Sequence, residues 1–331
     1  MSPSLQLQLV SDLHLEVPKS SPLYTTINID IRASYLCLLG DIGLVKDDGL
    51  YVFLRGTLEQ HMGCRIFYII GNHESYQLAY QETVAKLREF ESEALRVYDG
   101  RFKLLDRDRI DLDDSTTLLG CTLWSSISAE QADAACLRLN DFNPVRGIRG
   151  WSVDSYLSQH RQDIEWLNAQ VLELQDKEPH REIAILTHHS PTVDLRALEP
   201  RHRDSEVSTC FATDMSNQPC WMSPMVKLWA FGHTHYDCAF RDESTGKLVV
   251  TNQKGYGQQN VETVLVEVNR EEEWKLIAPR NLQEPITKDE WLKAGDDGNP
   301  RIKHVFESRE TKRSLFRRAA DRLKIFKRDG E

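Results

Sequence analysis

The chain has 331 residues, 40% of them hydrophobic, and a formal net charge of −10 at pH 7. A chain of this length can bury the core of one large domain or of two small ones. The acidic balance argues against a general nucleic-acid-binding protein, because such proteins present a basic face to the phosphate backbone.

The sequence shows no sign of a leader or a membrane span. The first strand-like run begins at Leu5, which leaves no room for a charged region and an apolar region ahead of it. No apolar stretch approaches the roughly 18 residues that a transmembrane helix needs. The seven cysteines lack CxxC spacing, so they indicate neither a disulfide framework nor a thiolate zinc site. We therefore expect a soluble, cytoplasmic protein with reduced cysteines.

Short β-rich runs alternate with helical patterns along most of the chain. Five such runs, at residues 5–10, 35–39, 65–70, 183–187 and 228–231, are predicted strands. Helical periodicity covers residues 80–97 and 155–174. This alternation predicts an α/β layered domain. Further strands at 115–124, 247–251 and 262–268 look like an antiparallel meander, which favours a mixed sheet or two packed sheets over a wholly parallel one.

Two segments differ from this pattern. Residues 125–151 are rich in Asn, Asp, Pro and Gly and are predicted to form a long, cap-like excursion from the sheet, a kind of segment that is commonly functional. We predict a catalytic domain over residues 1–285 and a basic tail over 286–331.

Residues 301–331, within this tail, carry eleven Lys and Arg against five Asp and Glu, with an apolar stripe at helical spacing. The alternatives for this amphipathic helix are docking onto the acidic domain, contact with a membrane surface or a partner, and disorder.

Residues that can bind a metal follow each of the five strand-like runs. In chain order they are Asp12, His14, Asp41, Asn72, His188, His233 and His235. Each has an ordinary explanation on its own, as a cap, a turn residue or a packed histidine. Seven ligands are too many for one ion with an open position, whereas one bridging carboxylate would give each of two ions four ligands. Carboxylates beside imidazoles suit Mn, Fe or Zn better than Ca.

The motifs Asp-x-His, Gly-Asp, Gly-Asn-His-Glu, His-His-x-Pro and Gly-His-x-His occur in this order between Asp12 and about Asn260. This pattern resembles the calcineurin-like metallophosphoesterase superfamily. The resemblance implies a four-layer αββα sandwich, in which two mixed β-sheets are packed face to face and flanked by helices, with a dinuclear centre at one edge.

The resemblance also implies roles for individual residues. One ion would be held by Asp12, His14 and His235, and the other by Asn72, His188 and His233. Asp41 would bridge the two ions, and His73 matches the histidine that such enzymes place beside the scissile phosphate.

Of the adjacent pair after residue 187, the family pattern favours His188 as the ligand. Adjacent strand residues face opposite ways, so His189 is expected toward the pocket or behind the ligands. Asn140, Asp141 and Tyr256 lie in segments similar to those of other superfamily members, and we expect them, with His189, to contact the substrate.

The resemblance favours one branch of the superfamily. Phosphoprotein phosphatases follow Gly-Asp with an Asp-Arg-Gly element that supplies a phosphate-binding arginine, whereas Gly40-Asp41 runs here into Ile42-Gly43-Leu44. The double-histidine motif instead resembles the phosphodiesterase and general phosphoesterase branches.

We therefore expect a hydrolase that cleaves a phosphodiester of a small substrate, such as a cyclic or linear nucleotide. The expected mechanism is attack by a metal-bridging hydroxide, with His73 donating a proton or a hydrogen bond to the leaving group. The alternative is a phosphomonoesterase acting on small phosphorylated metabolites. A nuclease is disfavoured by the acidic charge, and a non-enzymatic scaffold by the complete ligand set.

Overall fold

The computed structural model describes residues 5–199, 202, 205–256, 261–268 and 273–277. The chain divides into two units, Met1–Pro285 and Ile286–Glu331, and the described residues all belong to the first. The expected basic tail, with its amphipathic helix, lies outside the described residues, and the domain boundaries remain a prediction. Within the described part, no helix combines the length and the apolar character needed to cross a lipid bilayer.

Twelve strands of the described part form two six-stranded sheets. The first has the order β12-β11-β1-β2-β3-β4 and the second the order β5-β6-β7-β8-β10-β9. The strands are β1 (Gln6–Val10), β2 (Tyr35–Leu39), β3 (Arg65–Ile69), β4 (Phe102–Leu104), β5 (Asp108–Asp111), β6 (Thr116–Gly120), β7 (Glu182–Leu186), β8 (Val226–Phe231), β9 (Ala239–Arg241), β10 (Leu248–Thr251), β11 (Val264–Glu267) and β12 (Lys275–Ile277). Strands β1 to β4 run parallel to one another, as do β6, β7, β8 and β10, while antiparallel strands flank them. Both sheets are therefore mixed.

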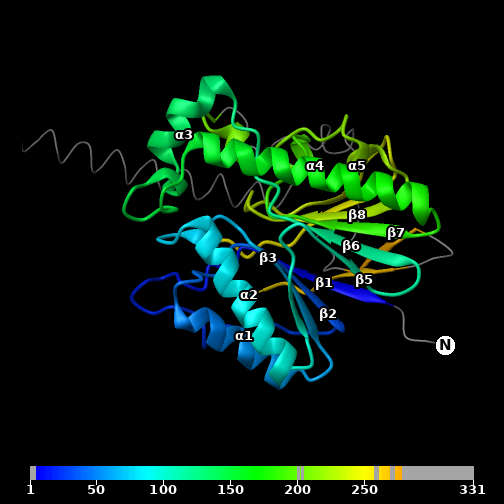
Figure 1. Ribbon diagram of the computed structural model, residues 1–331, viewed down its shortest axis with the longest axis horizontal. Coiled ribbons are helices and arrows are strands. Elements are labelled where there is room, and N and C mark those ends of the chain that lie inside the picture. Colours follow the sequence, from blue (N-terminus) through cyan, green and yellow to red (C-terminus); the bar gives the residue numbers. More distant parts are fainter. Residues whose placement is uncertain (1–4, 200–201, 203–204, 257–260, 269–272, 278–331) are drawn as a thin grey trace, which may run out of the picture. The chain divides into compact units, whose positions relative to one another are not determined.

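Helices cover the outer face of each sheet, as Figure 1 shows for α2 and α4. The α-helices are α1 (Asp48–Gln60), α2 (Tyr80–Val97), α3 (Ala132–Arg138), α4 (Val153–Lys177) and α5 (Pro219–Met222). Short 3₁₀ turns are η1 (His73–Ser75), η2 (Ala129–Gln131), η3 (Asn140–Phe142), η4 (Leu195–Ala197) and η6 (Ser208–Cys210).

Three apolar layers separate the four layers of secondary structure. Because strand side chains alternate between faces, Leu36 and Leu38 of β2 pack toward α1 and α2, whereas Cys37 and Leu39 pack toward the second sheet. On the other side, residues of β7 and β8 such as Trp229 pack against α4 and α5. The expected αββα sandwich of two mixed sheets is confirmed.

The pairing of two predicted strands differs from expectation. Strands β6 and β10 were predicted as part of an antiparallel meander. Each has one antiparallel neighbour, β5 for β6 and β9 for β10, but β6 also pairs in parallel with β7, and β10 with β8. Only β11 is antiparallel to both of its neighbours, β1 and β12. Alternating hydrophobicity indicates that a segment is a strand and which face it buries, but it does not specify the partner strand.

The fold brings the ends of five parallel strands to one region. The segments that follow β1, β2 and β3 leave the first sheet at its carboxyl edge, and those that follow β7 and β8 leave the second sheet in the same way. Backbone hydrogen bonds join successive turns: the Asp12 amide donates to Gly40 (3.0 Å) and the Gly232 amide donates to His188 (2.9 Å). The expected metal ligands lie in these turns.

Candidate metal centre

The backbone of five of the seven candidate ligands is in the left-handed region. Asp12, His14, Asp41, His233 and His235 all have φ between +47° and +67°. The left-handed region costs a non-glycine residue about 1–2 kcal/mol. Five such residues in three separate turns require strong local support, and their concentration at the expected ligands points to a functional demand on these side chains.

The buried carboxylate of Glu74 supplies part of that support. It accepts hydrogen bonds from the amides of Asp41 (2.9 Å), Ile42 (2.8 Å) and Gly71 (2.9 Å), and from the Tyr68 hydroxyl (2.8 Å). The turns after β2 and β3 are thereby held against each other. Only glycine fits at position 71, because a Cβ there would overlap the Oδ1 atom of Asp41.

Four candidate ligands form a first cluster, consisting of Asp12, His14, Asp41 and His235. The Nε2 atoms of His14 and His235 are 2.9 Å apart, and His235 Nε2 is 3.1 Å from Asp12 Oδ1. His14 Nε2 is 3.9 Å from Asp41 Oδ2. Atoms that each lie about 2.1 Å from a common centre are separated by roughly 3.0–3.4 Å, so the first two distances fit ligands around one transition metal ion.

A second group of candidate ligands meets on the other side of Asp41. The Nε2 atom of His188 lies 3.3 Å from Asn72 Oδ1 and 3.4 Å from Asp41 Oδ1. Its Nδ1 atom is 2.8 Å from the carbonyl of Leu39 and donates to it, which leaves the lone pair of Nε2 for a metal. The two carboxylate oxygens of Asp41 therefore lie near ligands of different clusters, which is compatible with a bridging role.

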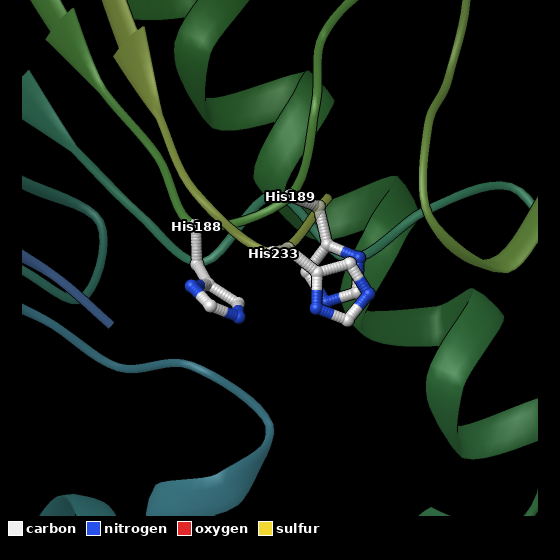
Figure 2. A group of neighbouring side chains, drawn as sticks. All are labelled: His188, His189 and His233. Atoms are coloured by element: carbon white, nitrogen blue, oxygen red, sulfur yellow. The ribbon is translucent and has the colours of Figure 1, made fainter. Parts of the chain in front are cut away.

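Three histidines surround this second position, and Figure 2 shows their rings. The ring centroids of His188 and His233 are 4.9 Å apart, and those of His189 and His233 are 3.9 Å apart. His189 is fully buried, and its Nδ1 atom lies 2.9 Å from the Ser125 hydroxyl. The structure thus places His189 against the ring of a candidate ligand, and it is not among the described residues that line the adjacent cavity.

The electrostatics of the site favour bound cations. Burial raises the pKa of Asp12, but the hydrogen bond with His235 and the charges of His235 and His188 together outweigh it and lower the pKa to about 2. Burial, followed by the charge of His188, lowers the pKa of His233 to about 3, so this imidazole is neutral. Burial lowers the pKa of His188, yet the charge and hydrogen bond of Asp41, together with the charges of Asp12 and Glu74, raise it to about 9. Ionised carboxylates and imidazoles that attract positive charge are what a metal site needs.

His73 lies beside the clusters between a carboxylate and a phenol. Its Nδ1 atom is 2.9 Å from Glu16 Oε1, and its Nε2 atom is 3.1 Å from the Tyr256 hydroxyl and 3.9 Å from Asp41 Oδ2. Burial lowers the pKa of His73, but the charge of Asp41 and the hydrogen bond with Glu16 raise it to about 9. Hydrogen bonds from His14 and His73 overcome the effect of burial and lower the pKa of Glu16 to about 2.

Asp141 lies behind Asn72. Its Oδ1 atom accepts hydrogen bonds from Asn72 Nδ2 (2.8 Å) and from the Tyr76 hydroxyl (2.8 Å). Because the amide nitrogen of Asn72 is held by Asp141, the amide oxygen is turned toward His188. Asp141 was predicted to contact the substrate; its observed contact orients a candidate metal ligand.

A cavity of about 380 Å³ opens from the two clusters. Its lining includes the candidate ligands Asp41, Asn72, His233 and His235, together with His73 and Tyr256. The remaining walls come from α3 and η3, with Asn140 and Asp141, and from residues between Leu198 and Phe211. The volume is within the range of small-molecule sites.

Comparison with known proteins identifies the family. Residues 8–237 match the family model described as calcineurin-like phosphoesterase. The chain belongs to this family. As a calcineurin-like phosphoesterase it is a metal-dependent phosphoric ester hydrolase, and the family together with the clusters indicates a dinuclear divalent-metal site.

This phosphoesterase is similar to a viral protein and to solved structures. It is 28% identical over 275 residues to uncharacterized protein L509 of Acanthamoeba polyphaga mimivirus, an alignment that covers 76% of this chain and 92% of that protein. Its fold is similar to that of phosphopantetheinyl hydrolase from Mycobacterium tuberculosis, with a TM-score of 0.52, 14% identity and coverage of 77% and 91% of the two chains. A dimetal phosphatase from Danio rerio gives a TM-score of 0.48 at 12% identity, covering 84% of this chain and 99% of that one.

Glu16, Tyr76 and Arg138 are among the residues of this phosphoesterase's site that were not predicted from its sequence. Glu16 could have been suspected, because it is a carboxylate two residues beyond His14 in the segment that also carries Asp12. Tyr76 and Arg138 carried no comparable signal. Arg138 ends helix α3, which was itself not predicted.

Replacing Glu16 tests whether it positions His73. In Glu16→Gln we expect kcat to fall by about 10- to 100-fold with little change in KM, since a neutral amide holds the imidazole less firmly. Steady-state kinetics and metal analysis check this, with the exposed Asp30→Asn as the control variant. If metal content falls in parallel with activity, Glu16 instead holds the metal ligand His14 in place, since His14 Nδ1 lies 3.5 Å from Glu16 Oε1.

Proposed function

We propose that this protein hydrolyses a phosphodiester of a small substrate at two metal ions. One ion is held by Asp12, His14 and His235, the other by Asn72, His188 and His233, and Asp41 bridges them. The observation that carries the proposal is the division of the two Asp41 oxygens between the clusters, at 3.4 Å from His188 Nε2 and 3.9 Å from His14 Nε2. Mn, Fe and Zn are the proposed metals, since the donors are imidazoles, carboxylates and an amide oxygen.

Two ions bound here would supply an activated water as nucleophile and positive charge for the phosphate oxygens. The chain itself would assist the leaving group through His73. The Glu16 carboxylate accepts a hydrogen bond from Nδ1–H, so the ring presents Nε2 to the cavity. The Tyr256 hydroxyl, 3.1 Å from that atom, marks a position where an oxygen of the substrate can take a hydrogen bond or a proton from His73.

The charges of the cavity support a diester rather than a monoester. Near neutral pH a phosphodiester carries one negative charge and a monoester close to two. Among the described residues of the cavity wall, Arg138 is the one Lys or Arg, and its side chain is 59% exposed. The buried neighbours of the clusters include Asp141, which adds negative charge. Arg138 is also the feature that favours the alternative, a phosphomonoesterase acting on small phosphorylated metabolites.

Nitrophenyl substrates separate the two activities. We expect kcat/KM for bis-p-nitrophenyl phosphate to exceed that for p-nitrophenyl phosphate when the metal-depleted enzyme is reloaded with Mn, Fe or Zn. Chelation should abolish both activities. A preference for the monoester with all three metals would establish the alternative, and hydrolysis that persists after complete chelation would reject the metal-based mechanism.

A further inference from the structure

The mouth of the cavity is built by two segments that are bound to each other. One contains η2, α3 and η3, and the other is 205–213. The Thr209 amide donates to the side chain of Gln131 (2.9 Å), and the Ser126 amide donates to the Thr213 hydroxyl (2.8 Å). The Tyr156 hydroxyl of α4 donates to the Cys210 carbonyl (3.0 Å). These hydrogen bonds hold the two segments together, so the side chains at the mouth of the cavity have defined positions.

Arg138 brings positive charge to this wall. It is the one Lys or Arg among the described residues that line the cavity. Its guanidinium pairs with Glu206, and the two side chains are 59% and 65% exposed. An ion pair so exposed is weak and is screened by salt, so an anion of a ligand can replace Glu206 at low cost. A guanidinium binds phosphate or carboxylate through two parallel hydrogen bonds.

The position of Arg138 relative to the metal clusters suggests which part of a substrate it meets. Six of the seven candidate ligands are buried, with Asp41 at 1% and Asn72 at 5% exposure, and His235 is partly exposed, whereas Arg138 is exposed. Asp141 touches Asn72 and lies three residues after Arg138. The backbones of Arg138 and Asp141 are therefore at most about 11 Å apart, so a phosphate at the clusters and a second group at Arg138 can belong to one small substrate, for example one with a spacer the size of a nucleoside.

The wall between these two points suits such a spacer. It combines the apolar side chains of Leu139, Val207 and Phe211 with the polar side chains of Asn140 and Ser208. Phe211 also stacks on the ring of His233, with centroids 4.8 Å apart, which fixes an aromatic surface next to the metal site. Apolar walls with a few placed polar groups are typical of sites for small organic ligands.

We propose that the substrate carries a second anionic group, a phosphate or a carboxylate, remote from the scissile phosphoester, and that Arg138 binds this group in exchange for Glu206. This inference rests on the proposed function and extends it from the reaction to the substrate class. Arg138 is then a specificity-determining residue that takes no part in bond cleavage.

The test uses pairs of substrates that share a scissile bond and differ in the remote group. One pair is thymidine 5′-(p-nitrophenyl phosphate) with and without a 3′-phosphate, and the other is the p-nitrophenyl phosphodiesters of glycerate and glycerol. For the anionic member of a pair, Arg138→Ala should raise KM by about 2- to 5-fold, the contribution expected of an exposed ion pair. For the neutral member KM should not change. The first pair reports on phosphate and the second on carboxylate.

Two further variants serve as controls. Arg149 belongs to the same excursion, pairs with Glu82 and is 63% exposed, but it is not among the described residues of the cavity wall. Arg149→Ala should therefore leave both members of each pair unchanged. Glu206→Gln should lower KM for the anionic members, because it removes the competing carboxylate.

A measurement of binding separates this inference from the proposed function. Calorimetry with the metal-loaded protein compares thymidine 3′,5′-bisphosphate with thymidine 5′-monophosphate. Tighter binding of the bisphosphate that disappears in Arg138→Ala supports the inference, even if no diester is hydrolysed and the proposed function fails. Equal binding of the two nucleotides by the wild type, together with equal effects of Arg138→Ala on both members of both substrate pairs, would overturn it.

Discussion

Asp41→Asn is expected to lose at least one of two bound metal ions and most of the activity. The two oxygens of this carboxylate lie near ligands of different clusters, so its charge would be shared between the two cations of the proposed centre. A neutral amide bridges cations poorly, because its nitrogen has no lone pair to offer and its oxygen carries no full charge. Metal analysis of the purified variant, beside kcat on bis-p-nitrophenyl phosphate, measures both effects.

The control for this variant is Asp48→Asn, an exposed carboxylate in the first turn of α1. It should retain the metal content and turnover of the wild type. Circular dichroism shows whether Asp41→Asn is still folded. This check is needed because the Asp41 side chain also accepts a hydrogen bond from the His73 amide (2.9 Å). Two ions retained at full turnover in Asp41→Asn would contradict the dinuclear arrangement.

His73→Ala has the second largest expected effect. Both ions should stay bound, because the His73 ring is not needed to complete either set of candidate ligands. Turnover should fall by roughly 10²- to 10⁴-fold, the usual contribution of a general acid. The loss should be smaller for a nitrophenyl leaving group than for an alkyl one, since nitrophenolate departs with little protonation.

A series of diesters with leaving groups of graded pKa measures this dependence. His180→Ala, an exposed histidine whose Nε2 lies 3.1 Å from the Asp114 carbonyl, is the control and should behave as the wild type. If His73→Ala slows good and poor leaving groups equally, His73 positions the phosphate and does not protonate the leaving group.

Local patterns accounted for much of the fold. The strand at 35–39 and the helix at 80–97 have the predicted bounds, because their hydrophobic periods match the faces that they bury. Helix α1 was not predicted; its segment contains Gly49 and Gly56, which weaken a helical signal. The parallel pairing of β6 with β7 and of β10 with β8 was also not predicted, because the partners of a strand depend on the arrangement of the whole sheet.

The candidate ligands could be expected together because parallel strands place their carboxyl ends at one edge. The hydrogen bonds between loops could not be predicted from the order of the strands. The His73–Glu16 contact joins residues 57 positions apart, and the Asn72–Asp141 contact joins residues 69 apart. Their geometry depends on the turns after β1 and β3 and on the path of the excursion, none of which follows from local periodicity.

The most direct test of the dinuclear account is a titration of the metal-depleted protein with Mn, Fe or Zn, followed by both metal content and hydrolysis of bis-p-nitrophenyl phosphate. The ligand arrangement predicts that activity rises with added metal and saturates at two ions per chain. Full activity at one ion per chain, or in the chelated protein, would contradict it.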